Sequence, residues 1–368
     1  MKKIPLIKPY ITQEVKDKVC AILDGGYLTE GIATQDLEDS FKDYIGCKYA
    51  LAACNCTVGL EMALRAMGIG PGDEVIVPDY TYPATASVVE IVGARIVLVD
   101  VDPQTMLIDY DVLESAITEK TKAVMPVSIF GNPLDYERLR RIKEKYHLLI
   151  LEDAACSIGA EFGGTKVGNL ADISVFSLHP RKFITTGEGG MITTNNAEWA
   201  EWMDSYKHFG MASQDSRAGT QFDRIGTNYK LSNIQAAVGL VQMKYIEELL
   251  SQRQLLANNY IQLLDNHPTI RFQKLSPLGV HSYQSFCVFT SHRDNVIATM
   301  REQGIEVQIG TYSLHMHKAY NENANCKVSG KMEGSKYAFE HCLTLPLYHD
   351  LSIDEQEYIV EKLTEIIP

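Results

Sequence analysis

One lysine stands in a segment whose composition suits covalent chemistry. Lys182 follows the apolar run Ile173–Phe176 and precedes the stretch Thr185-Thr186-Gly187-Glu188-Gly189-Gly190. A lysine in an apolar pocket loses proton affinity and becomes nucleophilic toward an aldehyde. The glycines permit tight turns and a close approach of the backbone to a ligand. We therefore predict that Lys182 reacts with a carbonyl group; for any single lysine taken alone, a solvated surface position is the alternative.

A carboxylate follows another apolar run. Asp153 stands at the end of Ile150-Leu151-Glu152, directly before Ala154-Ala155. Ligands of open α/β sheets usually bind beyond the carboxyl ends of strands. Asp153 is therefore a candidate ligand-binding carboxylate, and a helix cap or a salt bridge is the structural alternative.

A third segment could receive a phosphate. Cys54-Asn55-Cys56-Thr57-Val58-Gly59 precedes an amphipathic pattern that begins at Leu60. The free N–H groups and the dipole at a helix N-terminus favour an anion there. Helix capping alone would also explain Asn55 or Thr57.

Alternating strands and helices are predicted around these segments. Leu60, Ala63, Leu64 and Met67 recur at helical spacing. Further apolar runs read as strands separated by helices, which indicates a sheet covered on both faces. These runs are Glu74–Pro78, Ile96–Val99, Ala123–Val127, Leu148–Leu151 and Ile173–Phe176.

The later part of the chain changes character. Residues 233–250 read as one long helix with Ser232 as its N-cap, and Ser352-Ile353-Asp354-Glu355 forms a capping box that opens a final helix. Shorter strands and helices lie between them. We expect a large domain over residues 1–245 and a smaller domain over residues 246–368, although the N-terminal segment could pack on the smaller one.

Composition limits the classes of function. The 368 residues carry a net charge of −13, which makes the chain a poor general binder of nucleic acid. We find neither an apolar stretch of membrane-spanning length nor the apolar region of a signal peptide, so we expect a cytoplasmic protein. The eight cysteines read as reduced, mostly buried residues. Cys54 and Cys56 form a close pair with no second pair to complete a zinc site, and we predict no metal.

Five motifs together resemble one family. The chain resembles the DegT/DnrJ/StrS sugar-nucleotide aminotransferases, which have the aspartate-aminotransferase-type fold (fold type I) and use pyridoxal 5′-phosphate (PLP). The similarity runs from about Tyr27 to the C-terminus, and its most specific part is Lys182–Gly190. The motifs are Gly70–Pro78, Thr81–Ala86, Glu152–Ala155, Lys182–Gly190 and Asn228–Ala237.

The resemblance implies a fold and an activity. It implies an α/β large domain of three layers, α/β/α, with a mixed, mostly parallel sheet, and a smaller α+β C-terminal domain. It implies a homodimer with shared active sites that moves an amino group onto a nucleoside-diphosphate-linked keto sugar in deoxyamino sugar and polysaccharide biosynthesis. The donor would be glutamate, the kinetics ping-pong, and Lys182 would hold PLP as an internal aldimine.

Roles for the remaining cofactor contacts are also implied by the resemblance. Asp153 would keep the pyridinium nitrogen protonated, which maintains the ring as an electron sink. Tyr82 would lie against the ring, although it could be ordinary core. The phosphate would be bound by Cys56, Thr57, Ser177 and, from the neighbouring subunit, Asn228. Ser177 could instead be a satisfied hydroxyl at a strand end, and Asn228 could be a turn residue.

Three positions depart from the family pattern. Many relatives have Gln where this chain has Cys156, and a thiol is a weaker partner for the ring hydroxyl. Cys56 often corresponds to Gly. Lys230, often Arg in relatives, keeps the charge and loses the fork geometry.

Substrate contacts and rival functions remain open. Tyr27, Arg217, Arg224, Tyr312 and His315 could face the sugar nucleotide, although a structural or solvated role would explain each equally well. A PLP-dependent dehydratase or lyase could share this scaffold, and so could a non-catalytic regulator that binds PLP or a sugar nucleotide. Lys182 favours transamination, because the dehydratases of the family have His in its place.

Overall fold

The computed structural model describes residues 3–212 and 220–367, so the candidate Arg217 lies outside the described residues. Among these residues, no helix combines the length and the apolar character that a membrane span requires. The helices are α1 (Gln13–Gly25), α2 (Ile32–Ile45), α3 (Cys56–Ala66), α4 (Pro83–Ile91), α5 (Tyr110–Ala116), α6 (Tyr136–Tyr146), α7 (Ala197–Lys207), α8 (Asn233–Met243), α9 (Ile246–Leu264), α10 (Arg293–Glu302), α11 (Lys318–Asn321), α12 (Glu333–His341) and α13 (Ile353–Ile366), with the 3-10 turns η1 (Ile129–Gly131) and η2 (Leu314–Met316).

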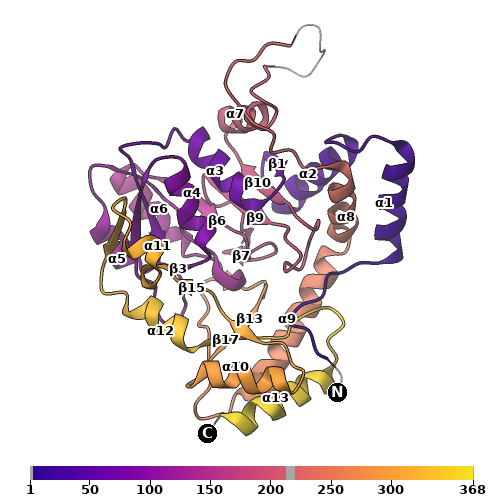
Figure 1. Ribbon diagram of the computed structural model, residues 1–368, viewed down its shortest axis with the longest axis vertical. Helices are drawn as coiled ribbons and strands as arrows, with labels where there is room; N and C mark the ends of the chain where they lie inside the picture. The colour runs from indigo at the N-terminus through magenta and orange to yellow at the C-terminus, as the bar shows by residue number, and fades with distance from the viewer. Residues whose placement is uncertain (1–2, 213–219, 368) are drawn as a thin grey trace.

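A large mixed sheet lies at the centre of the molecule (Figure 1). It has eight strands in the order β1-β10-β9-β6-β5-β2-β4-β16. Within it β10 runs antiparallel to both of its neighbours, and every pairing from β9 to β16 is parallel. Its strands are β1 (Tyr49–Ala53), β2 (Glu74–Pro78), β4 (Arg95–Val99), β5 (Thr121–Val124), β6 (Leu149–Asp153), β9 (Ile173–Ser177), β10 (Gly190–Thr194) and β16 (Cys326–Ser329).

Helices cover both faces of this sheet. Successive residues of β2 show the alternation, because Val75 and Val77 belong to one buried cluster and Ile76 belongs to another. The cluster of Val75 and Val77 includes residues of α3, α4 and α7, and the cluster of Ile76 includes residues of α2, α6 and α8. Strands buried on both faces explain the continuous apolar runs of the sequence. The predicted three-layer α/β/α architecture with a mixed, mostly parallel sheet is confirmed.

Local signals placed most element boundaries correctly. Asn55 caps α3 by accepting a bond from the Val58 N–H at 3.0 Å, and Ser232 and Ser352 open α8 and α13 with capping boxes. The single helix predicted over residues 233–250 is wrong, because the chain breaks between α8 and α9. Neither Gly nor Pro marks this break. The two residues at the break, Lys244 and Tyr245, instead both bond Glu14 of α1, far away in the sequence.

The C-terminal part builds a second sheet and its own core. This sheet has the order β11-β13-β17-β14, and α10, α13 and the second half of α9 pack on it. Ile4 joins this core, and its backbone bonds Gly304 and Glu306. The strands outside the large sheet are β3 (Tyr80–Thr81), β7 (Glu161–Phe162), β8 (Thr165–Lys166), β11 (Arg271–Phe272), β12 (Gly279–Val280), β13 (Phe286–Phe289), β14 (Gln308–Ile309), β15 (Tyr312–Ser313) and β17 (Cys342–Leu345).

The two parts of the chain interleave, as one strand and one helix show. Strand β16 comes from the C-terminal part and forms the edge of the large sheet next to β4. Helix α9 contributes Ile246 and Leu249 to the large core and Leu256 and Leu264 to the small one. We keep a division near residue 245 as a proposal, with residues 326–329 belonging structurally to the large sheet.

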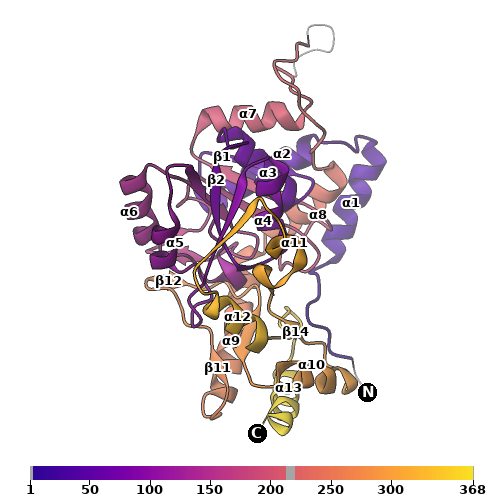
Figure 2. The same ribbon diagram turned by 60° about the vertical axis from the view of Figure 1, so that its left-hand side comes forward.

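An arm protrudes from the body between α7 and α8 (Figures 1 and 2). Its described parts run side by side through bridges of His208 with Asn228 and of Met211 with Phe222. Ile225 on this arm is 97% exposed and Phe222 is 61% exposed. Large apolar side chains at this level of exposure are typical of a surface that meets another molecule.

Two adjacent leucines of α9 test the contribution of the small core to stability. Leu256 is 5% exposed and Leu255 is 67% exposed. We predict that Leu256→Ala lowers the free energy of unfolding by about 2–5 kcal/mol, because it removes buried methyl groups and leaves a cavity. Leu255→Ala should change it by less than about 0.5 kcal/mol. Urea unfolding followed by circular dichroism measures both, and equal effects of the two variants would contradict the described packing.

Candidate active site

The three chemically promising segments meet at the carboxyl edge of the large sheet. Asp153 ends β6, Ser177 ends the neighbouring β9, and Cys56 opens α3 just after β1. Lys182 lies in the connection between β9 and β10, and it interacts electrostatically with both Asp153 and Cys56. The chain therefore brings together the residues that the sequence singled out separately.

Asp153 is a buried carboxylate held by two donors. Its Oδ2 accepts a hydrogen bond from the Thr85 hydroxyl at 2.7 Å, and its Oδ1 accepts one from the Ala155 N–H at 3.2 Å. Burial raises the pKa of Asp153 by more than these bonds and the charge of Lys182 lower it. No cationic nitrogen lies within ion-pair distance of it among residues 3–212 and 220–367. A cationic partner would stabilise the ionised form.

Lys182 is held by the backbone of its own tight segment. Its N–H bonds the carbonyl of His179 at 2.8 Å, and Thr186 N–H bonds the carbonyl of Leu178 at 3.0 Å. The side chain is half-buried, and its Nζ donates to the Cys156 sulfur at 2.9 Å. The amine therefore has a defined position near the carboxyl end of β6.

The expected fall in the proton affinity of Lys182 is wrong for this structure. Burial lowers the pKa of the amine, but Cys156, Cys56 and Asp153 together raise it further, so that the pKa lies above its ordinary value. The apolar-pocket argument failed because it ignored the neighbouring groups.

The N-terminus of α3 leaves donors available. Asn55 satisfies Val58 and Gly59, and no acceptor contacts the N–H groups of Cys56 and Thr57 in the described part of the chain. A Cβ on Gly190 would lie 2.7 Å from the Cys56 nitrogen and 2.6 Å from the Asn55 carbonyl carbon. Only glycine at the start of β10 allows the helix end to approach this closely. The helix end is thereby fixed beside Ser177, which pairs with Gly190.

Tyr82 stands beside these groups as an exposed ring. It precedes α4 at its N-cap and is 65% exposed, which excludes the alternative of ordinary core. Its ring centroid lies 6.3 Å from that of Tyr312. Ser177 is half-buried, and its hydroxyl accepts a long bond of 3.4 Å from the His179 N–H, which leaves the donor of the hydroxyl available.

These residues fit the expected cofactor. A buried carboxylate without a cation suits a protonated ring nitrogen, free N–H groups at a helix N-terminus suit a phosphate, and an exposed tyrosine suits the face of a ring. The close approach of Gly190 to α3 keeps the phosphate end and the lysine segment in one place. Each individual contact with PLP stays a prediction.

Asn228 lies at the base of the arm and contacts neither Lys182 nor Asp153. Its Oδ1 accepts a bond from Lys230 Nζ at 2.5 Å, and Lys230 also lies over the ring of Phe209 at 5.0 Å from its centroid. Asn228 is exposed, as a residue that serves a neighbouring subunit must be. Lys230, which replaces the arginine of many relatives, thus positions Asn228.

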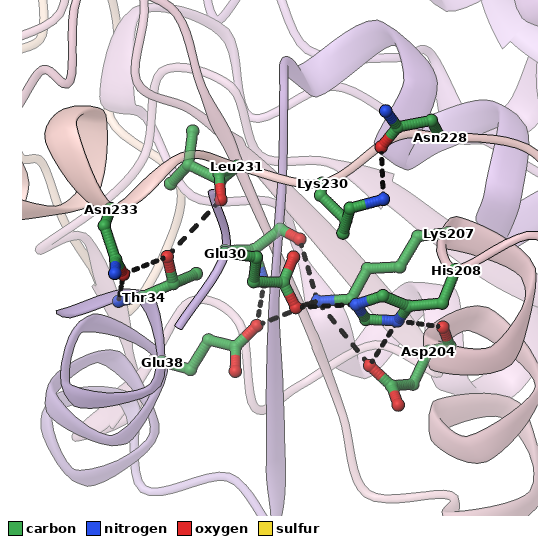
Figure 3. Close-up of polar contacts among 11 residues, drawn as sticks. Glu30, Thr34, Glu38, Asp204, Lys207, His208, Asn228, Lys230, Leu231 and Asn233 are labelled. Carbon is green, nitrogen blue, oxygen red and sulfur yellow. Dashed lines mark hydrogen bonds and ion pairs between the residues drawn. The ribbon is translucent and has the colours of Figure 1, made fainter. Parts of the chain in front are cut away.

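A buried charge network supports the arm, and the sequence analysis did not identify it (Figure 3). Lys207 is 1% exposed, and its Nζ lies 3.0 Å from Glu30, 3.2 Å from Glu38 and 3.6 Å from Asp204. His208 Nε2 lies 3.0 Å from the same oxygen of Glu30. Glu30, Asp204 and His208 could ligate a metal by distance alone, but the ammonium of Lys207 already occupies this space.

A separate set of hydrogen bonds holds the loop that carries Tyr27. Asn233 donates to the backbone oxygen of Tyr27 at 3.0 Å, and Thr34 donates to Asn233. Tyr27 is exposed, so a contact with a substrate or a second subunit remains open to it. Arg224 is less free, because it lies 5.6 Å above the ring of Trp202 and bonds its carbonyl. This position favours the structural alternative for Arg224.

His315 forms a polar cluster with Asp79 and Ser313, close to Tyr312 in the chain. Its Nδ1 lies 2.7 Å from the fully buried Asp79, which also accepts a bond from the Ser313 hydroxyl at 2.7 Å. The bond to Asp79 is the main cause that raises the pKa of His315. Asp79 was missed, although it follows the apolar run of β2 just as Asp153 ends that of β6.

A family model matches nearly the whole chain. Residues 9–364 match the model of the DegT/DnrJ/EryC1/StrS aminotransferase family.

Similar proteins and solved structures cover the chain to the same extent. GDP-perosamine synthase of Caulobacter vibrioides is 38% identical over 87% of this chain and 87% of its own length. UDP-4-amino-4-deoxy-L-arabinose–oxoglutarate aminotransferase of Shewanella sediminis is 31% identical over 99% of this chain and 98% of its own length. The putative sugar aminotransferase Spr1654 of Streptococcus pneumoniae, solved in its PMP form, superimposes with a TM-score of 0.93 at 29% identity over 99% of this chain and 98% of its own.

The charge network predicts a dependence of stability on pH. The carboxylates of Asp204 and Glu30 overcome the effect of burial and raise the pKa of His208 to about 9. Because the pKa of His208 is higher in the folded than in the unfolded chain, protonation of His208 stabilises the fold. This contribution is fully present below the unfolded-state pKa near 6.5 and is lost as the pH rises through about 9. We predict that the wild type loses up to about 3 kcal/mol of unfolding free energy from pH 6.5 to 9.5 relative to His208→Gln. Parallel pH profiles for the two proteins in chemical denaturation would contradict this assignment.

Proposed function

This chain belongs to the DegT/DnrJ/EryC1/StrS aminotransferase family and is a PLP-dependent aminotransferase, and we propose that it transfers an amino group from glutamate to a nucleoside-diphosphate-linked keto sugar. The observation that carries the proposal is the position of Lys182 near the buried Asp153, which has no ion-pair partner among the described residues, beside the N-terminus of α3. Two of the relatives named above, GDP-perosamine synthase and UDP-4-amino-4-deoxy-L-arabinose–oxoglutarate aminotransferase, have a nucleotide-linked sugar in their names, which supports the acceptor class.

Each part of the site has a role toward the cofactor. PLP supplies an electron sink and stores the amino group between the two half-reactions. Asp153 holds the proton of the ring nitrogen, and Thr85 and Ala155 fix that carboxylate. The N–H groups of Cys56 and Thr57 and the hydroxyl of Ser177 bind the phosphate. Tyr82 covers one face of the ring, and Cys156 lies where the family often has a glutamine.

Lys182 carries protons as well as the cofactor. Its Nζ would take a proton from the donor carbon and deliver it to the neighbouring carbon of the cofactor, acting as general base and then as general acid. The keto-acid product of the donor would leave before the sugar enters, which gives ping-pong kinetics.

The arm supports a homodimer with shared sites. Ile225 and Phe222 are exposed on it, and Asn228 stands at its base with its amide nitrogen free of contacts in the described chain. Lys207 and His208 brace this base from inside through Glu30. We propose that the arm packs on a second copy of the chain and that Asn228 completes the phosphate site of that copy.

Product analysis tests the activity. We predict that the PLP-loaded protein with glutamate aminates at least one member of a panel of nucleotide-linked 3-keto and 4-keto sugars, detected by mass spectrometry. Lys182→Ala should lower turnover by at least about 10²- to 10⁴-fold, because proton transfer is lost. Lys318→Ala, which removes a lysine that is 83% exposed, serves as the control. A dehydrated or cleaved product would instead favour the rival PLP chemistries.

Mixed dimers test the shared site. If Asn228 acts across the interface, each site consists of Lys182 from one subunit and Asn228 from the other. A homodimer of Lys182→Ala or of Asn228→Ala then has no complete site. After the two variants are mixed and allowed to exchange subunits, one site of each heterodimer has both residues, so activity should recover to about a quarter of that of the wild type. Mixtures that stay as inactive as the separate variants would show that Asn228 serves its own subunit.

A further inference from the structure

The backbone on both sides of Lys182 is bound by the side chain of one distant glutamine. Gln284 precedes β13 and is 5% exposed. Its Oε1 accepts a hydrogen bond from the Phe183 N–H at 3.1 Å, and its Nε2 donates to the Arg181 carbonyl at 2.8 Å. One side-chain amide therefore spans the residue that carries the amine and uses both of its ends to do so.

Regular secondary structure does not hold this segment, because residues 178–189 form neither a helix nor a strand. A second buried glutamine binds the segment a few residues further on. Gln242 of α8 accepts a bond from the Thr185 N–H at 3.0 Å and donates to the Thr185 carbonyl at 2.9 Å. Backbone groups that are buried away from water need such partners. Two side-chain amides thus do for the lysine segment what a neighbouring strand does elsewhere in the sheet.

Gln284 is itself fixed by a buried cation. Arg253 of α9 is 3% exposed, and it donates from Nη2 to the Gln284 carbonyl at 2.6 Å and from Nε to the Tyr283 carbonyl at 2.9 Å. Its guanidinium lies over the ring of Phe183, 5.3 Å from the centroid. Burial alone lowers the pKa of Arg253 to about 9, and no carboxylate lies within 4.0 Å of it in residues 3–212 and 220–367.

This use of Arg253 favours a role in function over a role in stability. Burying a cation without a counter-ion costs free energy of folding, and hydrogen bonds to carbonyls offset only part of that cost. Tyr283, which Arg253 also holds, has a φ of 49°, a left-handed conformation that a bulky side chain rarely adopts. Such costly local choices cluster at functional sites. The only chemically active residue that these bonds reach is Lys182.

The position of the lysine backbone matters because it sets the position of the amine. A displacement of about 1 Å at a reacting group can lower a rate by about 10²-fold. Without Gln284, the Phe183 N–H and the Arg181 carbonyl lose their bonds, while Gln242 still holds Thr185. The lysine end of the segment would then move and the glycine end would stay in place.

We propose that Gln284 is a positioning residue, which holds the backbone of Lys182 so that the amine can reach the carbonyl carbon of the cofactor, and that Arg253 fixes Gln284 for this purpose. The inference rests on the proposed function, because it takes Lys182 as the point of attachment. Gln284 acts through the backbone of Lys182 and not through a contact of its own with the cofactor.

Attachment of PLP to the cofactor-free protein tests this role without turnover. We expect Gln284→Met, which has a similar size and lacks both hydrogen bonds, to slow attachment to Lys182 by about tenfold or more, followed by absorbance and by borohydride trapping. The Kd of pyridoxamine 5′-phosphate should change by less than about threefold, because this form of the cofactor binds without a covalent bond to Lys182. A purely structural role of Gln284 would weaken both.

Gln356 provides a matched control in the small core. It is fully buried, and its amide donates to the Leu256 carbonyl at 2.8 Å and accepts from Asn259 at 2.9 Å. Gln356→Met should lower the midpoint of urea unfolding much as Gln284→Met does, and it should leave the rate of attachment unchanged. Gln284→Glu retains an acceptor for the Phe183 N–H, so its rate should be intermediate. This variant also covers the case in which Gln284→Met does not fold.

The possible results separate this inference from the proposed function. Attachment within about threefold of the wild-type rate in the folded Gln284 variants would overturn the positioning role. A parallel loss of affinity for pyridoxamine 5′-phosphate, or an equal slowing in Gln356→Met, would overturn it too, since either shows a general loss of structure. Wild-type protein that does not attach PLP to Lys182 would instead refute the proposed function.

Discussion

A carboxylate buried without a cation is the constraint on which the rest of this structure depends. Asp153 ends a strand inside the large sheet and has two hydrogen-bond donors, Thr85 and Ala155, for its charge. Burying an ionised group is costly unless it is paired and hydrogen-bonded. Its pKa is therefore raised, and a protonated ring nitrogen would supply the missing partner.

The backbone around Asp153 brings the other groups to the same edge. Parallel strands end together, so β6 and β9 deliver Asp153 and Ser177 side by side. Gly190 lets the N-terminus of α3 approach to a distance that no side chain would allow. The buried Lys207 bonds the carbonyl of Ala52 near the carboxyl end of β1 and so fixes the base of the arm at this same edge. Positioning in this site is thus done mostly by sheet geometry and by one glycine contact.

The sequence predicted the architecture well because its signals are local. Apolar runs, capping boxes and the motifs around Asp153 and Lys182 all lie within short segments. Features that depend on distant contacts were missed. The break between α8 and α9 coincides with bonds to Glu14, and the network of Lys207 joins Glu30, Glu38 and Asp204 from separate elements.

The same limit explains the errors within the site. The direction of the pKa shift of Lys182 depends on Cys156 and Cys56, whose proximity no spacing reveals. Asp79 is the exception, because the rule that selected Asp153 would also have found it.

Attachment of the cofactor tests the central claim most directly. The protein loaded with PLP is treated with borohydride, which makes the bond to the lysine permanent, and is then digested and mapped by mass spectrometry. We predict a single modified peptide that carries the cofactor on Lys182, and a weaker yield from Asp153→Ala, which lacks the carboxylate opposite the ring nitrogen. Cofactor found on another lysine, or on none, would contradict the account of this site.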